Sequence, residues 1–373
     1  MIANIRKILV FRIGSIGDML VSVPSLWVIK ENFPEAEMTL LHDVSIRTNV
    51  LSPQTIFQNS GIFSKYLTFF RTGEMNYARY ISKILSLALE IRRGGYDLCI
   101  DLSDKGANNQ HNKHQFFFRH LCGFSGDRLI TKTDIHDIEK RRADFGIPVQ
   151  QVGMELIERL GKAGIVSKDG RLRIGLTEAG QLLGSAKDLY EKLDTACPIV
   201  VAVGIGGKNP ACRWPIERYM ETINELILRY NIYPIIFSGK DDALAADVAI
   251  ENWGRGINAC QLTVQESFSL LTRCDYYLGN DTGTMHMAAS VGLRCIGIFS
   301  ARDLIGKWSP LGDGHTVIRK RVSCEGCGLV VCTNNNLCTM QITSQEVVAV
   351  CGGMFEQKLS CRPSEVDNRD HAS

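Results

Sequence analysis

An aspartate and a histidine stand five residues apart in the stretch GNDTGTMHMAAS (279–290). The strand-like run before this pair and the helix-like run after it are both apolar. If Asp281 ends the strand and residues 282–284 begin the helix, the free N–H groups of the first helical turn point out of the joint. Such groups bind a diphosphate. His286 is then either a contact in that site or an ordinary buried histidine, and the surrounding NDTG sequence favours the contact.

A second candidate is the turn IGSIGD (13–18), which follows the apolar run 7–12. Asp18 suits two roles there, because it can cap a helix or act as a general base facing a cleft. The turn is not a P-loop, since no Gly-Lys-Ser/Thr follows, and it lacks the G-x-G-x-x-G pattern of a dinucleotide site. The turn by itself leaves both roles of Asp18 open.

Two further strand ends carry charge. GIGGKNPACRWPIERY (204–219) places Lys208 and Arg213 in a Gly-rich loop, before a helix that Pro215 opens. Positive charge beside backbone N–H groups favours the binding of a phosphate, so this loop is a candidate anion site. The alternative interpretation is a basic loop that is simply solvated. In SGKDDALAADV (238–248) the acidic residues suit a helix start, and one carboxylate could also accept hydrogen bonds from a sugar.

The elements that must position these residues alternate between strand and helix. In the first half we expect strands at 7–12, 37–43 and 96–103, a helix at 19–33 whose first turns Pro24 tightens or kinks, and a helix at 148–165. In the second half we expect strands at 197–204, 233–239, 256–260, 276–280 and 294–300, and helices at about 215–230, 241–252, 264–273 and 283–291. This alternation predicts parallel sheets covered on both faces.

Two doubly wound halves in succession predict an α/β protein of two domains. Ligands of such sheets bind beyond the carboxyl ends of the strands, so we expect the site in a cleft between the domains. The turn-rich segment 166–195 marks the boundary. We therefore place an N-terminal domain at 1–185, a C-terminal domain at 186–361 and a polar flexible tail at 362–373.

The composition is that of a soluble globular protein. The 373 residues are 45% hydrophobic and carry a net charge of +2, so nothing in the overall charge calls for nucleic acid. No apolar run approaches the roughly 18–20 residues of a membrane-spanning helix. We interpret the apolar N-terminus as a core strand rather than a signal peptide. Most of the 13 cysteines stand singly in apolar runs, which is typical of buried thiols in a reducing compartment, so we expect a cytoplasmic protein.

A late cysteine cluster is the exception. The stretch CEGCGLVVCTNNNLCTM contains Cys324, Cys327, Cys332 and Cys338. A C-x2-C pair followed by two more cysteines can form a tetrahedral Zn or Fe site, although the later spacing departs from a standard pair. The alternatives are reduced thiols or a labile disulfide.

The segment NKHQFFFRHLCGF (112–124) mixes basic residues with three consecutive phenylalanines. One interpretation is a core helix with a solvated edge. The other is a contact with an acceptor or a membrane surface. Charge reversal at Lys113 and Arg119 would then reduce co-sedimentation with liposomes.

Taken together, these turns resemble glycosyltransferase family 9, the bacterial heptosyltransferases of lipopolysaccharide core assembly. The matching pieces are ILVFRIGSIGDMLVSVPSLWVIKENFP near the start, YDLCIDL (96–102), RWPIERY (213–219) and GNDTGTMHMAASVGLRCIGIFSARD (279–303). They extend in order over about residues 5–345, and the first and last pieces are the most specific.

The resemblance implies a GT-B fold with two Rossmann-like domains and an active site between them. It implies inverting transfer of a sugar, typically from ADP-L-glycero-D-manno-heptose to a lipopolysaccharide core or other envelope glycan at the inner membrane face, with no cofactor required. Asp18 looks like the general base. The implied donor-binding residues are Gly206, Lys208, Arg213, Asp241, Asp281, Thr282, Gly283 and His286, and the acceptor-side residues are Gly14, Ser15 and Gly17.

One position departs from the family pattern. The family often has a lysine two residues before the tryptophan of the WP pair, where it looks like a donor-phosphate contact, but this chain has Cys212. Lys208 or Arg213 would have to replace it. A non-catalytic sugar-nucleotide or glycan-binding relative is therefore an alternative. A Rossmann-type NAD enzyme is a further one, although no full dinucleotide fingerprint follows any strand.

Overall fold

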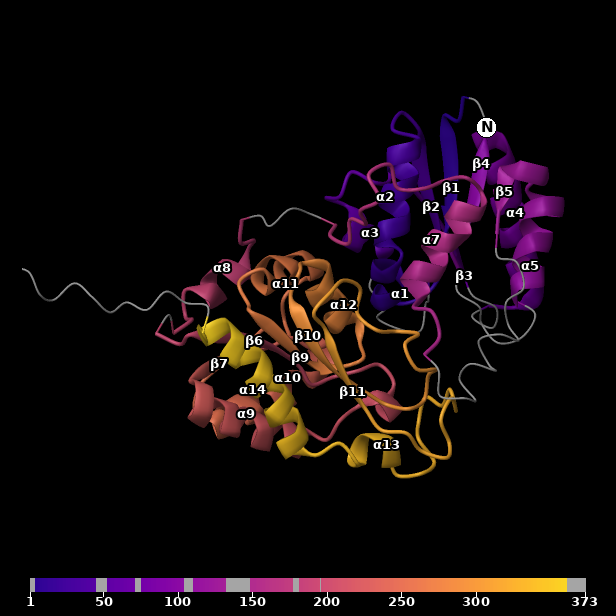
Figure 1. Ribbon diagram of the computed structural model, residues 1–373. Helices are drawn as coiled ribbons and strands as arrows, with labels where there is room; N and C mark the ends of the chain where they lie inside the picture. Colours follow the sequence, from indigo (N-terminus) through magenta and orange to yellow (C-terminus); the bar gives the residue numbers. More distant parts are fainter. Residues whose placement is uncertain are drawn as a thin grey trace, which may run out of the picture.

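The computed structural model describes residues 4–44, 52–70, 75–103, 110–131, 148–176, 181–194 and 196–360. These residues form two parallel β-sheets, each with helices packed against it (Figure 1). The predicted tail at 362–373 lies outside the described residues.

The N-terminal sheet has five parallel strands in the order β3-β2-β1-β4-β5. Its strands are β1 (Lys7–Phe11), β2 (Glu37–Val44), β3 (Lys65–Phe70), β4 (Leu98–Asp101) and β5 (Leu129–Ile130). Its helices are α1 (Ile16–Val21), α2 (Val23–Asn32), α3 (Pro53–Phe57), α4 (Tyr77–Gly94), α5 (Gln110–Phe116) and α7 (Val152–Lys162), with a π-helical turn η1 (Phe117–Leu121) and a 3-10 turn η2 (Gly126–Arg128). The sequence pattern missed β3 and α4, which lie between the second and third expected strands.

The predicted effect of Pro24 is confirmed. The expected helix at 19–33 is divided at Ser22 into the short α1 and the longer α2, and Pro24 stands in the first turn of α2, where a missing N–H costs nothing. The break allows α1 to start directly after β1. Its first turn is therefore held at the carboxyl edge of the sheet.

The C-terminal sheet has six parallel strands in the order β11-β10-β9-β6-β7-β8. The strands are β6 (Ile199–Gly204), β7 (Ile232–Ile236), β8 (Ile257–Asn258), β9 (Tyr276–Asn280), β10 (Arg294–Phe299) and β11 (Thr316–Arg319). The helices are α8 (Ser185–Tyr190), α9 (Ile216–Tyr230), α10 (Ala243–Trp253), α11 (Val264–Leu271), α12 (Gly283–Ser290), α13 (Leu337–Met340) and α14 (Ser344–Ser360), with 3-10 turns η3 (Pro210–Cys212) and η4 (Lys240–Asp242). Every residue of β6, β7 and β9 is buried, as expected for central strands of a sheet covered on both faces.

The two sheets are joined by contacts that involve backbone groups. The N–H of Val149 donates to Ile305 O over 2.7 Å, and the N–H of Val152 donates to Lys307 O over 3.0 Å, so the start of α7 is fixed to the segment that follows β10. On α11, Gln265 Nε2 donates to Thr55 O within α3. These contacts bring the carboxyl ends of β1 and β9 to the same region. The domain boundary near residue 185 stays a prediction.

Among the described residues, no helix combines the length and the apolar composition that crossing a bilayer requires.

Candidate functional site

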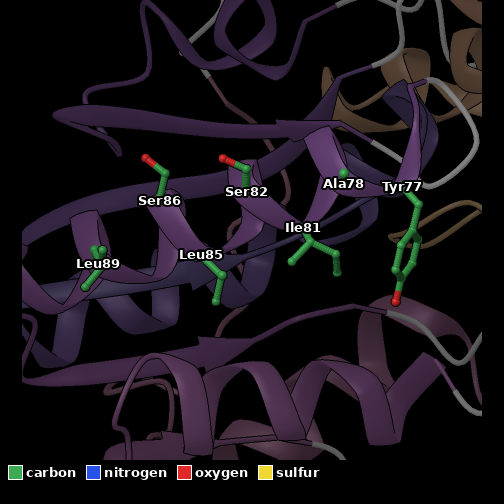
Figure 2. A pocket seen from close by; sticks show the side chains of 7 residues that line it. All are labelled: Tyr77, Ala78, Ile81, Ser82, Leu85, Ser86 and Leu89. Carbon is green, nitrogen blue, oxygen red and sulfur yellow. The ribbon is translucent and has the colours of Figure 1, made fainter.

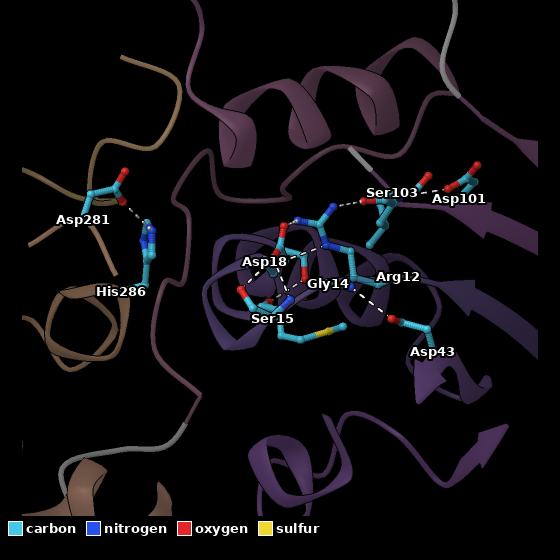
Figure 3. A network of polar contacts seen from close by, with 12 residues as sticks. Arg12, Gly14, Ser15, Asp18, Asp43, Asp101, Ser103, Asp281 and His286 are labelled. Carbon is cyan, nitrogen blue, oxygen red and sulfur yellow. Dashed lines mark hydrogen bonds and ion pairs between the residues drawn. The ribbon is translucent and has the colours of Figure 1, made fainter. Parts of the chain in front are cut away.

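The starts of α1 and α12 meet where the two sheets face each other. A Cβ added to Gly17 would lie 3.0 Å from His286 Cδ2, and one added to Gly283 would lie 2.1 Å from Ile16 Cγ2. Glycine at these two positions therefore lets the helices approach more closely than any other residue would allow. The approach places Asp18, from the first strand end, on the opposite side of the domain junction from Asp281 and His286 (Figure 3).

Asp18 is held in a fixed orientation in the first turn of α1. Its Oδ2 accepts hydrogen bonds from Ser15 N over 2.7 Å and from Ser15 Oγ over 2.8 Å, and its side chain is 23% exposed. Gly14 has a φ of +130°, and a Cβ there would lie 2.3 Å from Asp18 Cγ. The carboxylate thus needs glycine beside it, while the Gly14 N–H donates to Asp43 Oδ1 over 3.1 Å.

Arg12 is a partner of Asp18 that the sequence pattern did not single out. Its side chain is 1% exposed, its Nε donates to Asp18 O over 2.8 Å, and its Nη1 donates to Leu102 O over 2.6 Å. Its Nη2 lies 3.7 Å from Asp18 Oδ1. These contacts hold the first turn of α1 to the end of β4. The available signal was an arginine that ends an otherwise apolar strand.

Asp281 and His286 lie close together, but they are not an ion pair at neutral pH. His286 Nε2 is 3.9 Å from Asp281 Oδ1, and the side chains are 5% and 15% exposed, respectively. Burial raises the pKa of Asp281 to about 8, with Asp303 and Asp18 adding to the rise and Arg302 opposing it. Burial lowers the pKa of His286 to about 4, against the opposing effect of Asp18. Between these values both side chains are predominantly neutral.

The start of α12 is organised to present backbone donors. Thr282 is the N-cap, and its Oγ1 lies 2.8 Å from Thr284 Oγ1, which in turn lies 3.0 Å from the hydroxyl of Tyr277. The Gly-rich loop after β6 comes close to this turn, since a Cβ on Gly207 would lie 3.3 Å from Thr282 Cγ2. A helix start beside a Gly-rich loop supplies N–H groups and a positive dipole end to an anion.

Asn280, the last residue of β9, fixes the position of that loop. Its side chain is fully buried, and its Nδ2 donates to the carbonyl oxygens of Ile205 and Gly206 over 3.0 and 2.9 Å. Its Oδ1 accepts from Trp214 N and from the Tyr219 hydroxyl, each over 3.0 Å. One side chain thus joins β9, the loop and the start of α9. Sequence reasoning missed this role, although a buried polar residue next to Asp281 was a usable signal.

The two predicted cations lie on the rim of this site. Lys208 is exposed, and Arg213 is 43% exposed, with its Nε donating to Gly207 O over 2.9 Å and its Nη1 3.0 Å from Asp242 Oδ1. Asp242 is the acidic residue of its turn that faces the loop, because a Cβ on Gly206 would lie 2.1 Å from Asp242 Oδ2. The predicted Asp241 is exposed, and its sugar-binding role stays a prediction.

Cys212 occupies a buried position behind the loop. Its Sγ lies 3.7 Å from Ser300 Oγ, and burial raises the pKa of the thiol to about 11. It therefore stays neutral and supplies no positive charge at neutral pH. Sequence reasoning missed Arg302, a cation whose charge acts on the Cys212 thiol. Its Nη1 donates to Asp303 Oδ2 over 2.6 Å, and it also donates to the carbonyl oxygens of Gly328 and Leu329.

The predicted metal site at the late cysteines is not formed in this structure. Cys324 and Cys327 are exposed, Cys332 is half-buried and Cys338 is buried, and all four are free thiols. Across the described ranges, no three His, Cys, Asp or Glu side chains gather closely enough to hold a metal ion. The C-x2-C spacing suggested a ligand pair, but the loop is held by backbone bonds instead, from Gly326 N to Ala301 O and from Gly328 N to Arg302 O.

Comparisons with known proteins show what this chain is similar to. The model of glycosyltransferase family 9 (heptosyltransferase) matches residues 177–337, which contain the loop after β6, Asn280 and the start of α12. A search of curated proteins gives no match.

Solved structures match nearly the whole chain. The glycosyl transferase family 9 protein from Veillonella parvula is 18% identical, with a TM-score of 0.71 over 94% of this chain and 98% of that one. The ADP-heptose lps heptosyltransferase II of E. coli is 18% identical, with a TM-score of 0.62 over 95% and 99% of the two chains. The E. coli heptosyltransferase WaaC with ADP-2-deoxy-2-fluoro heptose is 14% identical, with a TM-score of 0.60 over 93% and 99%.

These matches confirm three predictions. The GT-B fold is confirmed by the structural likeness along the chain. The resemblance to glycosyltransferase family 9 is confirmed by the family match, which includes the loop after β6 and the start of α12. The assignment to glycosyltransferase enzymes follows from that match.

Proposed function

We propose that this protein transfers a heptose, with inversion, from ADP-heptose to a hydroxyl group of a lipid-anchored envelope glycan, such as a lipopolysaccharide core. The observation that carries the proposal is the meeting of two helix starts, with the Asp18 carboxylate on one side and the anion-binding turn at Thr282–Thr284 on the other. The choice of ADP-heptose is supported by the WaaC structure, which contains an ADP-heptose analogue.

Asp18 acts as the general base in this mechanism. Two hydrogen bonds from Ser15 hold Oδ2, and the Arg12 guanidinium lies 3.7 Å from Oδ1. The carboxylate takes the proton of the acceptor hydroxyl as its oxygen attacks the anomeric carbon, on the face opposite the diphosphate. The bond from that carbon to the diphosphate oxygen breaks, and its electron pair leaves with the diphosphate. General base assistance of this kind contributes roughly 10²–10⁴-fold to the rate.

The start of α12 and the loop after β6 bind the departing diphosphate. Backbone N–H groups of the first turn donate to it, and Arg213, held at Gly207 O, supplies positive charge. Asp281 and His286 are neutral at pH 7, so neither adds a negative charge beside the phosphates. Neutral side chains at this position suit hydrogen bonds to sugar hydroxyls.

No step in this mechanism calls for a metal ion, and the cysteine cluster has no part in it. We propose that the enzyme works on the cytoplasmic side of the inner membrane, where it would meet both a soluble nucleotide sugar and a lipid-anchored acceptor. A purified protein with less than about 0.2 Zn or Fe per chain, compared with one ion for a filled site, would rule out a structural metal at these cysteines.

A non-catalytic, donor-binding relative is the second candidate, because Cys212 is neutral where a cation is often found. The Asp18→Asn variant separates the two. We expect sugar transfer to fall at least about 10²-fold while ADP affinity changes less than about threefold, because the base acts only in the transition state. Asp127→Asn, which changes an exposed carboxylate of the same domain, is the control.

Unchanged transfer in Asp18→Asn would remove Asp18 as the base. Absence of transfer in the wild-type protein, together with clear ADP binding, would favour the non-catalytic candidate.

A further inference from the structure

Helix α4 carries an apolar stripe that the rest of the described chain leaves uncovered. Tyr77, Ile81, Leu85 and Leu89 are 79%, 37%, 47% and 51% exposed, and they line an open groove along the helix (Figure 2). Their spacing of four residues puts them on one face, beside the face that Leu87, Ala88 and Ile91 bury against the sheet. A single exposed leucine is ordinary, but a row of four large side chains marks a contact surface.

The surroundings of this stripe are strongly basic. Helix α4 has Arg79, Lys83, Arg92 and Arg93 against one acidic residue, Glu90. The neighbouring α5 and η1 add Lys113 and Arg119 and no acidic residue, and Arg92 Nη2 ties the two elements by donating to His120 O over 3.1 Å. All six basic side chains are exposed, whereas the net charge of the whole chain is only +2. Positive charge is therefore concentrated on the helix that carries the stripe and on the elements next to it.

Phe116 extends the apolar surface onto α5. It is 57% exposed, while Phe118 is buried in the core with Phe11 and Phe124. The three consecutive phenylalanines thus divide between the core and the surface, so the core interpretation of the segment 112–124 holds for Phe118, and the interpretation as an acceptor or membrane contact stays a prediction.

We infer that the α4 face, defined by Tyr77, Ile81, Leu85 and Leu89 with the basic residues around them, docks on an anionic lipid bilayer. Exposed leucines beside lysines and arginines are the combination that binds such a surface, because the apolar side chains enter the acyl boundary and the cations meet lipid phosphates. A protein partner or a second copy of this net-basic face would gain less, since two such faces repel each other.

The orientation of α4 also suits the proposed acceptor. Helix α4 follows β3, so Tyr77 lies at the carboxyl edge of the N-terminal sheet, the same edge from which Asp18 extends. A bilayer along the stripe would lie beside the domain that holds the base, with its near end at the cleft. This part of the inference rests on the proposed function, whereas lipid docking itself does not depend on catalysis.

The test is co-sedimentation of the full chain with vesicles of about 30% phosphatidylglycerol in phosphatidylcholine. We expect binding that weakens strongly as salt rises from about 0.1 to about 0.5 M, and little binding to pure phosphatidylcholine. Leu85→Gln together with Leu89→Gln should lower the partition coefficient about tenfold or more. Arg79→Gln together with Lys83→Gln should lower it and reduce its salt dependence.

The matched control is Leu228→Gln with Leu244→Gln. These leucines are each 81% exposed on helices of the C-terminal domain, so the same chemical change should leave vesicle binding unaltered. ADP binding, measured on every variant, reports the state of the donor site separately. A failure of docking with intact ADP binding would overturn only this inference, and a lack of ADP binding with intact docking would count only against the proposed function.

Three results would overturn the inference. One is a wild-type protein that does not bind the anionic vesicles. The second is equal binding by the wild type and the Leu85→Gln, Leu89→Gln variant. The third is a dimer in sedimentation velocity that this variant abolishes while vesicles go unbound, which would assign the face to a second copy of the chain.

Discussion

The stability of this protein should fall as the pH rises from about 6.5 to 8, and Asp281 should be the cause. In the folded state the pKa of Asp281 is raised from 3.8 to about 8, so the folded protein binds a proton that the unfolded chain has released. Wherever the folded state binds more protons, the free energy of unfolding decreases as the pH increases. The stabilising effect of this proton is complete below pH 3.8 and is lost as the pH rises through about 8.

Histidines act in the opposite direction at lower pH. The pKa of His286 is lowered from 6.5 to about 4, and burial also lowers the pKa values of His42 and His315. These groups bind fewer protons when folded, so below pH 6.5 they make stability rise with pH. At pH 6.5 the unfolded histidines are still half protonated, so above this pH the three histidines together raise the stability by a further ~1 kcal/mol. The Asp281 effect, with a slope of up to about 1.4 kcal/mol per pH unit, lowers the stability by roughly 2 kcal/mol between pH 6.5 and 8, so a net fall of roughly 1 kcal/mol remains.

The assay is equilibrium urea unfolding at about pH 6.5 and 8.5. Asp281→Asn replaces the protonated carboxyl with a neutral group of the same shape. The decrease in the free energy of unfolding between the two pH values should therefore disappear in this variant. Asp241→Asn, which removes an exposed carboxylate close by in the same domain, should keep it. A wild-type protein with equal stability at the two pH values, or an Asp281→Asn variant with an undiminished fall, would refute the reasoning.

Three further predictions follow from the packing of the site. Gly283→Ala should destabilise the protein by about 1–3 kcal/mol, since the new methyl group would lie 2.1 Å from Ile16 Cγ2. The control Gly353→Ala, with open space around it in α14, should be neutral or stabilising by up to about 1 kcal/mol. Thermal unfolding measures both changes, and equal effects would contradict the close approach of α1 and α12. Asn280→Ala should lower the free energy of unfolding by at least about 2 kcal/mol and weaken ADP binding, because it leaves buried polar groups without partners. The control is Asn224→Ala, which removes one partner of an exposed amide pair. An equally small loss of stability in both variants would contradict the role of Asn280. Arg12→Met should lower sugar transfer, with partial recovery in Arg12→Lys, because Arg12 positions the first turn of α1 through Asp18 O and fixes it to the end of β4 through Leu102 O; equal transfer by the wild type and Arg12→Met would contradict this positioning role.

The sequence predicted the repeating elements and the strand-end residues, because both follow from local patterns. Runs such as 276–279 and 295–299 are apolar along their length, which is typical of central parallel strands. Asp18, Asp281 and His286 were found because each follows such a run. The short β3 and the edge strand β11 were missed, since the first has only one buried residue and the second is short and polar at its ends.

The residues that hold the site together were not predictable in the same way. Some of these residues bond to partners far away in the sequence: Arg12 to a residue 90 positions away and Asn280 to one 66 positions away. Arg302 bonds to a loop that has no periodic pattern. Only the folded structure brings such partners together. The cysteine spacing left a metal site, reduced thiols and a labile disulfide open, because spacing cannot tell whether a loop brings the thiols together. The neutral state of Asp281 and His286 likewise depends on burial, which depends on the other domain.

The most direct test of the central claim is a calorimetric titration of ADP, UDP, GDP and NAD into the wild-type protein. A diphosphate site at the start of α12 that serves ADP-heptose should bind ADP, bind UDP and GDP at least about tenfold more weakly, and give no heat with NAD. A preference for UDP or GDP would contradict ADP-heptose as the donor. No binding of any nucleotide would contradict the donor site itself.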